Sequence, residues 1–387
     1  MTPAARVQSA IDILDKIILA ARDNGAPADA ILSEWFKGHR FAGSKDKAAI
    51  RDIVWDTVRA YGNRPASGRS AILGTGRLDW AALFDGSNYG AAAVQPDEQR
   101  DVTGILPDWF AATRPDWLDD EEALALLGRA PLDVRINPLK SDLEAVAAVF
   151  PDSEPIAGLD FGLRLPPQTQ FDQSELVRNG SVEVQDAGSQ HVARIAAAQP
   201  GELVVDLCAG AGGKTLALAA GMDRQGRLIA CDTNRARLSK LRPRAKRAGV
   251  ESIECRLLDP GREADALADL AGQADLVLVD APCSGSGTWR RSPDLRWRWT
   301  FERLAAVEAL QRHVIALGRS LLKPNGRLVY AVCSVRDEEG ANQITVAENL
   351  IATTCQQSVG RTRGGGLLLT PFHDRTDGFF IATLSQH

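Results

Sequence analysis

The sequence predicts an α/β protein with a mostly parallel sheet in its larger, C-terminal part, preceded by a helical N-terminal domain and a small α/β subdomain. Three observations carry this prediction. From about residue 180 onward, short apolar strands alternate with helical segments, which is typical of a parallel sheet covered on both faces. Before about residue 100, apolar residues recur at helical spacing. Between these parts, two short strand patterns flank a helix.

Residues 1–100 are predicted to be helical because VQSAIDILDKIILAA and AAIRDIVWDTVRAYG space their apolar residues three or four apart. The looser stretch FDGSNYGAAAVQPDEQRDVTG marks the first boundary. Residues 101–178 form the predicted subdomain, a candidate RNA-binding part, with the strands LDVRINPL and FGLRLP around the helix SDLEAVAAVF. Residues 179–387 form the predicted main domain, with the strands ELVVDL, RLIAC, SIECRL, DLVLVD, RLVYAV and FFIATL.

Composition limits the class of protein. The chain of 387 residues is 44% hydrophobic and 25% charged, as in soluble globular proteins. It has no stretch of 18 consecutive apolar residues and no N-terminal leader pattern, so we expect a cytoplasmic protein that does not bind a membrane, and a monomer. Its six cysteines include no C-x-x-C pair and its five histidines are scattered, so we expect reduced thiols and no metal.

Two local basic segments contrast with the net charge of −5. Residues 224–247 contain nine Arg or Lys and one acid, and a solvated helix face is an equally good interpretation of this segment. Residues 289–303 contain five basic residues with Trp289, Trp297 and Trp299 interleaved. Positive charge beside aromatic rings is typical of surfaces that bind single-stranded nucleic acid.

A glycine-rich turn follows the first strand of the main domain, within the run from Asp206 to Thr215. A phosphate-binding P-loop would need glycine at position 208, where the chain has Cys208. A dinucleotide fingerprint would need a third glycine at position 215, where it has Thr215. The remaining interpretation is an adenosine-type ligand without a pyrophosphate.

Acidic residues follow the next three strands. Asp232 ends the second strand, 22 residues after Gly210, where a carboxylate can accept hydrogen bonds from ribose hydroxyls. Asp259 follows the third strand and Asp280 ends the fourth. A single aspartate in such a place is often only a helix cap. Three together with the glycine turn indicate S-adenosylmethionine as the cofactor.

Two cysteines stand out from the others. Cys283 follows the fourth strand and Cys333 follows the fifth, whereas Cys208, Cys231 and Cys255 lie in or near strands and are expected to pack as small apolar residues. Adjacent parallel strands lie about 4.8 Å apart. We therefore expect both thiols to lie in one cleft with Asp280.

These motifs resemble those of the RsmB/NOP group of RNA (cytosine-5)-methyltransferases over about residues 130–387. The matching segments are Asp206 to Thr215, Asp280 to Thr288, Arg290 to Asp294, Tyr330 to Ser334, Arg135 to Lys140, Gln185 to Gln190 and Asp377 to Phe380. Val332 departs from the group, which usually has threonine before the cysteine. The resemblance implies a Rossmann-like class I methyltransferase fold with a mostly parallel, seven-stranded sheet.

The resemblance also implies roles for individual residues. Cys333 would attack carbon 6 of a cytosine, Cys283 would assist release of the covalent adduct, and Asp280 would contact both cofactor and base. Lys214 would lie near cofactor and substrate. Cofactor contacts would come from Cys208, Ala209, Gly210, Ala211, Gly212, Gly213, Lys214, Asp232, Asp259 and Asp280. RNA contacts would come from Lys214, Arg290, Arg291 and Arg135.

The expected substrate is RNA, with ribosomal RNA favoured over tRNA because residues 1–100 have a suitable size and pattern for a NusB-like helical domain. Alternatives are a tRNA cytosine-5 methyltransferase, a DNA cytosine-5 methyltransferase in which Cys283 attacks, and a non-catalytic RNA-binding assembly factor.

Overall fold

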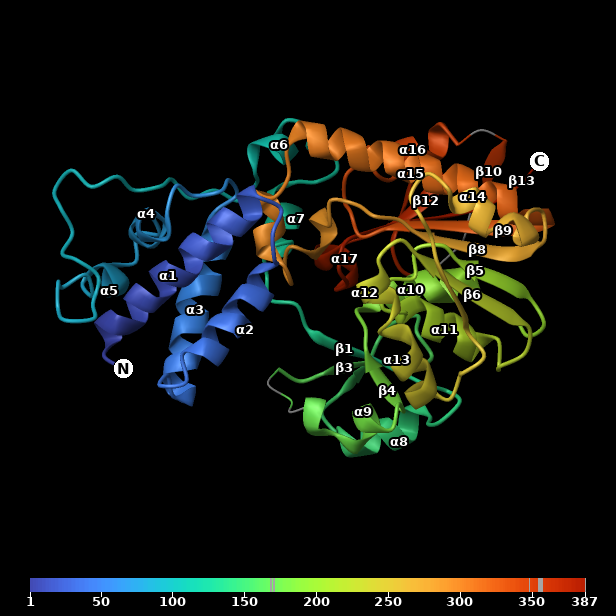
Figure 1. Ribbon diagram of the computed structural model, residues 1–387, viewed down its shortest axis with the longest axis horizontal. Helices are drawn as coiled ribbons and strands as arrows, with labels where there is room; N and C mark the ends of the chain where they lie inside the picture. Colours follow the sequence, from blue (N-terminus) through green and yellow to red (C-terminus); the bar gives the residue numbers. More distant parts are fainter. Residues whose placement is uncertain (168, 170, 348, 354–357, 387) are drawn as a thin grey trace. The chain divides into compact units, whose positions relative to one another are not determined.

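The computed structural model describes residues 1–387 except 168, 170, 348, 354–357 and 387, so Cys355 lies outside the described residues (Figure 1). The chain forms two compact units. The first comprises Met1–Gly128 and Thr288–Leu304, and the second comprises Arg129–Gly287 and Ala305–His387. The first boundary therefore differs from the predicted residue 100, because the helical segments as far as residue 128 belong to the first unit.

The first unit is built from amphipathic helices around one core. Helix α1 (Pro3–Arg22) is capped by the Thr2 hydroxyl, which accepts a hydrogen bond from the amide of Ala5 (3.2 Å). Its apolar residues recur at helical spacing and are buried. The other helices are α2 (Ala28–Gly38), α3 (Ser44–Ala60), α4 (Gly68–Gly74), α5 (Leu78–Ala81), α6 (Asp108–Ala111) and α7 (Asp120–Ala125).

A segment from much later in the chain completes this core. After the strand Ala274–Asp280 and before helix α15 (Phe301–Leu321), the chain forms η3 (Ser286–Thr288) and η4 (Pro293–Trp297). Trp297 is only 3% exposed and its indole donates to the carbonyl of Tyr61 (3.0 Å). Arg296 is 1% exposed and donates to the carbonyl of Val58 (2.7 Å). The Thr288–Leu304 segment is thus a structural part of the helical unit.

The smaller sheet of the second unit has the order β2-β3-β1-β4 and is antiparallel wherever pairing is seen. Its strands are β1 (Leu132–Ile136), β2 (Glu154–Pro155), β3 (Gly162–Leu165) and β4 (Val182–Val184). Helices α8 (Leu143–Val149), η1 (Phe171–Gln173) and α9 (Glu175–Arg178) lie between them in the chain. Because β4 pairs with β1, this sheet extends beyond the predicted boundary at residue 178.

The larger sheet contains nine strands within the described residues, rather than the predicted seven. The order is β11-β12-β13-β9-β8-β5-β6-β7, and β10 pairs with β13. The five strands from β7 to β9 are parallel, whereas β13 pairs antiparallel with β9 and β12. The strands are β5 (Leu203–Asp206), β6 (Arg227–Asp232), β7 (Glu254–Leu257), β8 (Ala274–Asp280), β9 (Leu322–Val332), β10 (Leu350–Thr353), β11 (Arg361–Arg363), β12 (Gly366–Leu369) and β13 (Phe379–Gln386).

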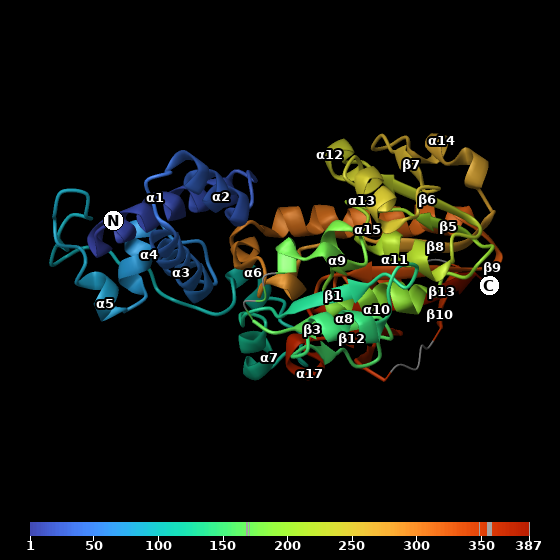
Figure 2. The same cartoon turned by 90° about the horizontal axis from the view of Figure 1, so that it is seen from below.

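Helices cover both faces of this sheet, which explains why its strands are apolar without alternation. Val204 and Leu276 pack in a cluster with α10 (Ala187–Ala196), α11 (Gly213–Gly221) and α13 (Leu241–Ala248). The next residues along each strand, Val205 and Val277, pack in a second cluster with α15. Figure 1 shows α15 on one side of the strands and α10 and α11 on the other, and Figure 2 shows the same elements seen from below. The remaining helices are α12 (Arg235–Leu238), α14 (Glu263–Ala266), η2 (Ala268–Leu270), α16 (Ala341–Thr345) and α17 (Pro371–Asp374).

Candidate active site

The glycine turn connects β5 to the N-terminus of α11. Gly212 has a φ of +87°, and a Cβ atom there would lie 2.1 Å from Cδ1 of Leu241. Gly210 has a φ of +57°, and a Cβ atom added there would have no other atom within 4 Å. A Cβ atom added at Gly213 would meet only the side chain of Gln185, at 3.9 Å. The turn therefore needs glycine for its backbone at two positions and leaves open space beside the start of α11.

Asp232 fixes the glycine turn from the end of β6. One carboxylate oxygen accepts from the amide of Gly210 (2.8 Å) and the other from the amide of Asn234 (2.6 Å). Each oxygen retains a further lone pair that can accept a ligand hydroxyl. Asp259, after β7, is exposed. The position of Asp232 fits the predicted ribose acceptor, and the role of Asp259 stays a prediction.

Asp206, at the end of β5, is a buried acid that lies beneath the turn. Its Oδ2 accepts from the hydroxyl of Thr215 (2.6 Å), while its Oδ1 is buried without a hydrogen-bond partner among the described residues. Burial raises the pKa of Asp206 to about 7, and the hydrogen bond from Thr215 opposes this shift. An incompletely satisfied polar atom here is consistent with a site that is completed by a ligand.

Lys214 and Asp280 form an ion pair between the first turn of α11 and the end of β8. The distance from Nζ to Oδ2 is 2.6 Å, and the ammonium also lies 5.3 Å from the ring centroid of Phe379. Burial opposes the charged form of Lys214, but its attraction to Asp280 and their hydrogen bond outweigh burial, so the pKa of Lys214 is raised. The negative charge of a Cys333 thiolate would raise it further. A retained positive charge therefore lies close to this thiol.

The two candidate thiols meet at the ends of adjacent strands. Strands β8 and β9 pair in parallel, with Asp280 opposite Ala331. The Sγ atoms of Cys283 and Cys333 are 3.3 Å apart, as predicted from the strand ends. The hydrogen bond with Cys333, together with burial, raises the pKa of Cys283 well above its usual range. Cys283 therefore keeps its proton at neutral pH, and either sulfur can be the donor of the hydrogen bond between them.

A buried carboxylate, Glu339, connects the two thiol-bearing loops and was not foreseen from the sequence. Glu339 is 0% exposed. Its Oε1 accepts from the amide of Ser284 (2.6 Å) and from Gln311 (3.2 Å), and its Oε2 accepts from the hydroxyls of Ser284 and Ser334. Because Ser284 follows Cys283 and Ser334 follows Cys333, one carboxylate holds both loops.

The sequence offered one signal for this cluster, namely that each candidate thiol is followed directly by a serine. Glu339 itself lies in the acidic run Asp337 to Glu339, which is typical of a solvated turn. Nearby, Val332 is fully buried in the apolar cluster beneath α15. An apolar residue therefore fits its surroundings without needing a polar partner.

Two of the four predicted RNA contacts, Arg135 and Arg290, are buried, and the RNA-binding roles of all four stay predictions. Arg135 is 7% exposed and donates to the side chain of Gln185 (2.8 Å), and burial lowers its pKa to about 10. Arg290 is 6% exposed, whereas Arg291 is exposed. Trp289 is 0% exposed and packs edge-on against Phe110 at 5.1 Å, so it is not a stacking surface.

The first basic segment is partly used for packing within the second unit. Arg244 and Arg247 of α13 both bind Glu183 of β4 at 2.8 Å. Arg244 also donates to the carbonyl of Ala211 in the glycine turn (2.6 Å). These contacts connect the small sheet to the turn, which explains part of the high arginine content of α13.

Among the described residues, no group of three or more His, Cys, Asp or Glu side chains could hold a metal ion. No helix in the described part of the chain combines the length and apolarity that crossing a membrane requires. Cys231 is buried in the core and burial raises its pKa, consistent with its predicted packing role.

Comparisons with known proteins find related sequences and a similar fold. The family model for the 16S rRNA methyltransferase RsmB/F matches residues 193–385. "Probable ribosomal RNA small subunit methyltransferase B" from Synechocystis sp. is 36% identical over 301 residues, which cover 70% of this chain and 66% of the relative. "Ribosomal RNA small subunit methyltransferase B" from Pasteurella multocida is 31% identical over 294 residues, covering 73% and 65%. The chain thus spans about two thirds of the length of these relatives.

The fold is also similar to a solved structure, NSun6 from Pyrococcus horikoshii with SFG. The TM-score is 0.64 at 20% sequence identity, and the match covers 73% of this chain and 97% of that chain.

Proposed function

Because the chain belongs to the RsmB/F family of methyltransferases, we propose that it transfers a methyl group from S-adenosylmethionine to carbon 5 of a cytosine in RNA. The observation that carries this proposal is the pair of thiols 3.3 Å apart, at the ends of adjacent strands that also present Asp280. A methyltransferase that acts on an oxygen or an amino nitrogen needs no thiol, whereas carbon 5 of cytosine must be activated first.

The cofactor would be held by the glycine turn and by the acids that follow the strands. Open space beside Gly210 and Gly213 and the free lone pairs of Asp232 fit an adenosine group. When bound, S-adenosylmethionine supplies an electrophilic methyl group on a sulfonium centre. Of the predicted contacts, Cys208, Ala209 and Ala211 would act through the backbone of the turn, and Asp259 would lie at its margin.

Cys333 would be the nucleophile. Its sulfur adds to carbon 6 of the cytosine, and the ring then becomes an enamine that is nucleophilic at carbon 5. Asp280 would lie near the ring and Lys214 beside Asp280, so that the charges that develop on base and sulfur are balanced within the site. After methylation, a water molecule that reaches the base would accept the proton from carbon 5. The electron pair of that C–H bond then re-forms the double bond between carbons 5 and 6, and the bond between carbon 6 and sulfur breaks to release Cys333 as a thiolate.

Cys283 would assist this last step. Because its pKa is raised, Cys283 keeps its proton and would donate a hydrogen bond to the sulfur of Cys333, 3.3 Å away, as negative charge develops on that sulfur. That hydrogen bond stabilises Cys333 as a leaving thiolate. The same hydrogen bond makes Cys283 a poor nucleophile, which supports the assignment of attack to Cys333 and of release to Cys283.

The direct test is to trap the covalent adduct. Cys283→Ala should accumulate a protein–RNA adduct that survives a denaturing gel, and Cys333→Ala should form none. The reverse pattern would refute the assignment and favour the DNA-type mechanism in which Cys283 attacks. Calorimetry with S-adenosylmethionine tests the alternative of a non-catalytic assembly factor, since that alternative predicts no binding at millimolar concentration.

The proposed substrate is ribosomal RNA, as in the names of the relatives, with tRNA as the alternative. The target base must be in a single strand or flipped out of a helix, because the thiol has to reach carbon 6. Bisulfite sequencing of total RNA from cells with and without the gene would identify the modified cytosine and decide between the two classes.

A further inference from the structure

A groove in the first unit lies between α2 and α3 and is separate in sequence from every residue of the candidate active site. Its volume is about 600 Å³, within the range of ligand sites. The lining residues are Asp29, Leu32, Ser33, Phe36, Lys37, Arg40, Lys47, Arg51 and Trp55. Four cations and one carboxylate thus line it, and two aromatic rings are among its walls.

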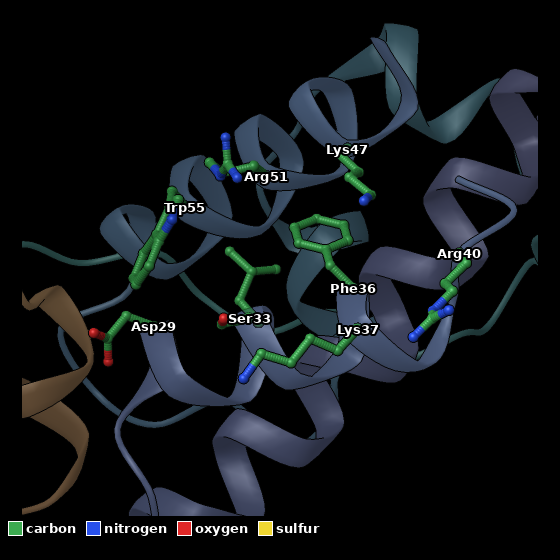
Figure 3. A pocket seen from close by; sticks show the side chains of 9 residues that line it. Asp29, Ser33, Phe36, Lys37, Arg40, Lys47, Arg51 and Trp55 are labelled. Carbon is green, nitrogen blue, oxygen red and sulfur yellow. The ribbon is translucent and has the colours of Figure 1, made fainter. Parts of the chain in front are cut away.

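Helical spacing brings the α3 residues to one side of the groove. Lys47, Arg51 and Trp55 are four residues apart and line up along α3 in Figure 3, while Phe36 projects between the two helices. Both cations lie near the Phe36 ring, with Nζ of Lys47 at 5.9 Å and the guanidinium carbon of Arg51 at 5.7 Å from its centroid. Such contacts orient the cations without using up their hydrogen-bond donors.

The charges of the groove are not neutralised within the protein. In the part of the chain that the structure describes, no ion pair is formed by Arg40, Lys47 or Arg51. Lys37 contacts Glu34 at 3.7 Å, but both side chains are more than 70% exposed, so this pair is weak. A row of unpaired cations beside a half-buried tryptophan combines a site for phosphates with a platform for a base.

We propose that the α2–α3 groove binds a single-stranded segment of the RNA substrate, with phosphates on Lys47 and Arg51 and a base against Trp55. The choice of RNA over an acidic protein segment rests on the proposed function. It also rests on the aromatic wall, because a base can stack on Trp55 whereas a carboxylate gains little from it. The groove then gives affinity for RNA and takes no part in methyl transfer.

Counterion release sets the expected size of the effect. Each phosphate contact with a single strand contributes about 0.7 to the slope of log K against log salt concentration, so two contacts contribute about 1.4, or about 25-fold in affinity near 0.1 M salt. The double variant Lys47→Gln, Arg51→Gln should therefore bind about 25-fold more weakly near 0.1 M salt, and no more weakly near 1 M. Its salt slope should be shallower by about 1.4.

The experiment measures fluorescence anisotropy of a labelled oligouridylate of about 12 nucleotides, a length typical of single-strand sites, with the full-length protein. The matched control is Lys16→Gln, Lys45→Gln, which also removes two exposed cations from helices of this unit but outside the groove. A charge-conserving variant, Lys47→Arg with Arg51→Lys, should bind like the wild type. Trp55→Leu should weaken binding by about fivefold or more without changing the salt slope.

Wild-type affinity in the Gln double variant, or an equal loss in the control, would overturn the proposal; in the first case an acidic protein segment would be the occupant to test. Thermal midpoints check that each variant is folded. Methyl transfer at saturating RNA should proceed at the wild-type rate in the groove variants. If binding follows these expectations but no cytosine is methylated, the proposed function fails and the groove proposal stands.

Discussion

Replacing Glu339 with alanine is expected to loosen both thiol-bearing loops at once. The substitution removes the acceptor of four hydrogen bonds, two from Ser284 and one each from Ser334 and Gln311. All four donors are in a region that water does not reach, because Glu339, Gln311 and Ser334 are each 0% exposed. Unlike a surface carboxylate, Glu339 thus cannot be replaced by solvent.

The magnitude follows from the cost of leaving buried donors unpaired, about 1–3 kcal/mol for each group. These costs do not add, since the loop relaxes after the first loss, and removing one member of a buried charged cluster typically costs about 3–5 kcal/mol. For Glu339→Ala we expect a decrease of about 3–5 kcal/mol in the free energy of unfolding. Glu339→Gln retains one acceptor oxygen and the side-chain shape, so we expect about 1–2 kcal/mol.

Urea unfolding measures these differences, with Glu338→Gln as the control because its side chain is 29% exposed and lies one residue away. Adduct trapping with the Gln variant then tests positioning, since its fold should persist while the distance between the thiols is less well fixed. Unchanged stability in Glu339→Ala would refute the energetic reasoning. A destabilised Gln variant that forms and releases the adduct at wild-type rates would show that the carboxylate supports the fold without orienting the thiols.

Three further predictions concern the cofactor turn. Gly212→Ala should lower the free energy of unfolding by about 1–2 kcal/mol, because Gly212 has a positive φ and an added Cβ atom would clash with Leu241. Gly213→Ala should leave this stability unchanged and weaken cofactor binding. Thermal unfolding measures the first effect and calorimetry the second. Asp232→Asn should weaken S-adenosylmethionine binding at least about tenfold, because an amide cannot accept from both the turn and a ribose; equal affinity would exclude the ribose role. Because the pKa of Asp206 is raised, the folded state holds this proton more tightly than the unfolded chain does, and stability is lost as pH rises from about 4 to about 7. Asp206→Asn should remove this loss. Urea unfolding of both proteins at pH 5 and pH 8 measures the difference.

The site at the strand ends could be predicted from the sequence because the order of apolar strands fixes which loops meet. Cys283 and Cys333 each follow such a strand, and the parallel pairing of β8 with β9 brings them together. Asp232 and the glycine turn follow the same rule. The antiparallel additions at the β13 edge could not be foreseen, because short strands such as Arg361–Arg363 carry too little pattern to be distinguished from loops.

The roles of the arginines and tryptophans after Cys283 were harder to predict, because the residue type alone does not indicate which groups accept hydrogen bonds from its side chain. Arg296 is surrounded by backbone carbonyls, which satisfy a guanidinium as well as phosphates would. Trp297 is equally suited to a core or to a stacking surface. The sequence pattern does not indicate that this segment packs with helix α6, where Trp109 donates to the carbonyl of Arg296, 187 residues later in the chain.

The contribution of Thr288–Leu304 to the helical unit has a consequence for how the chain is made. During synthesis, the first 128 residues emerge without Trp297, whose ring belongs to the core formed by α1 to α5. That core is complete only after residue 304 has left the ribosome, by which time four of the nine strands of the larger sheet, β5 to β8, have also been made. A fragment cut at residue 128 would lack Trp297 and would expose the apolar residues that its ring covers, so the helical unit is not one continuous piece of sequence.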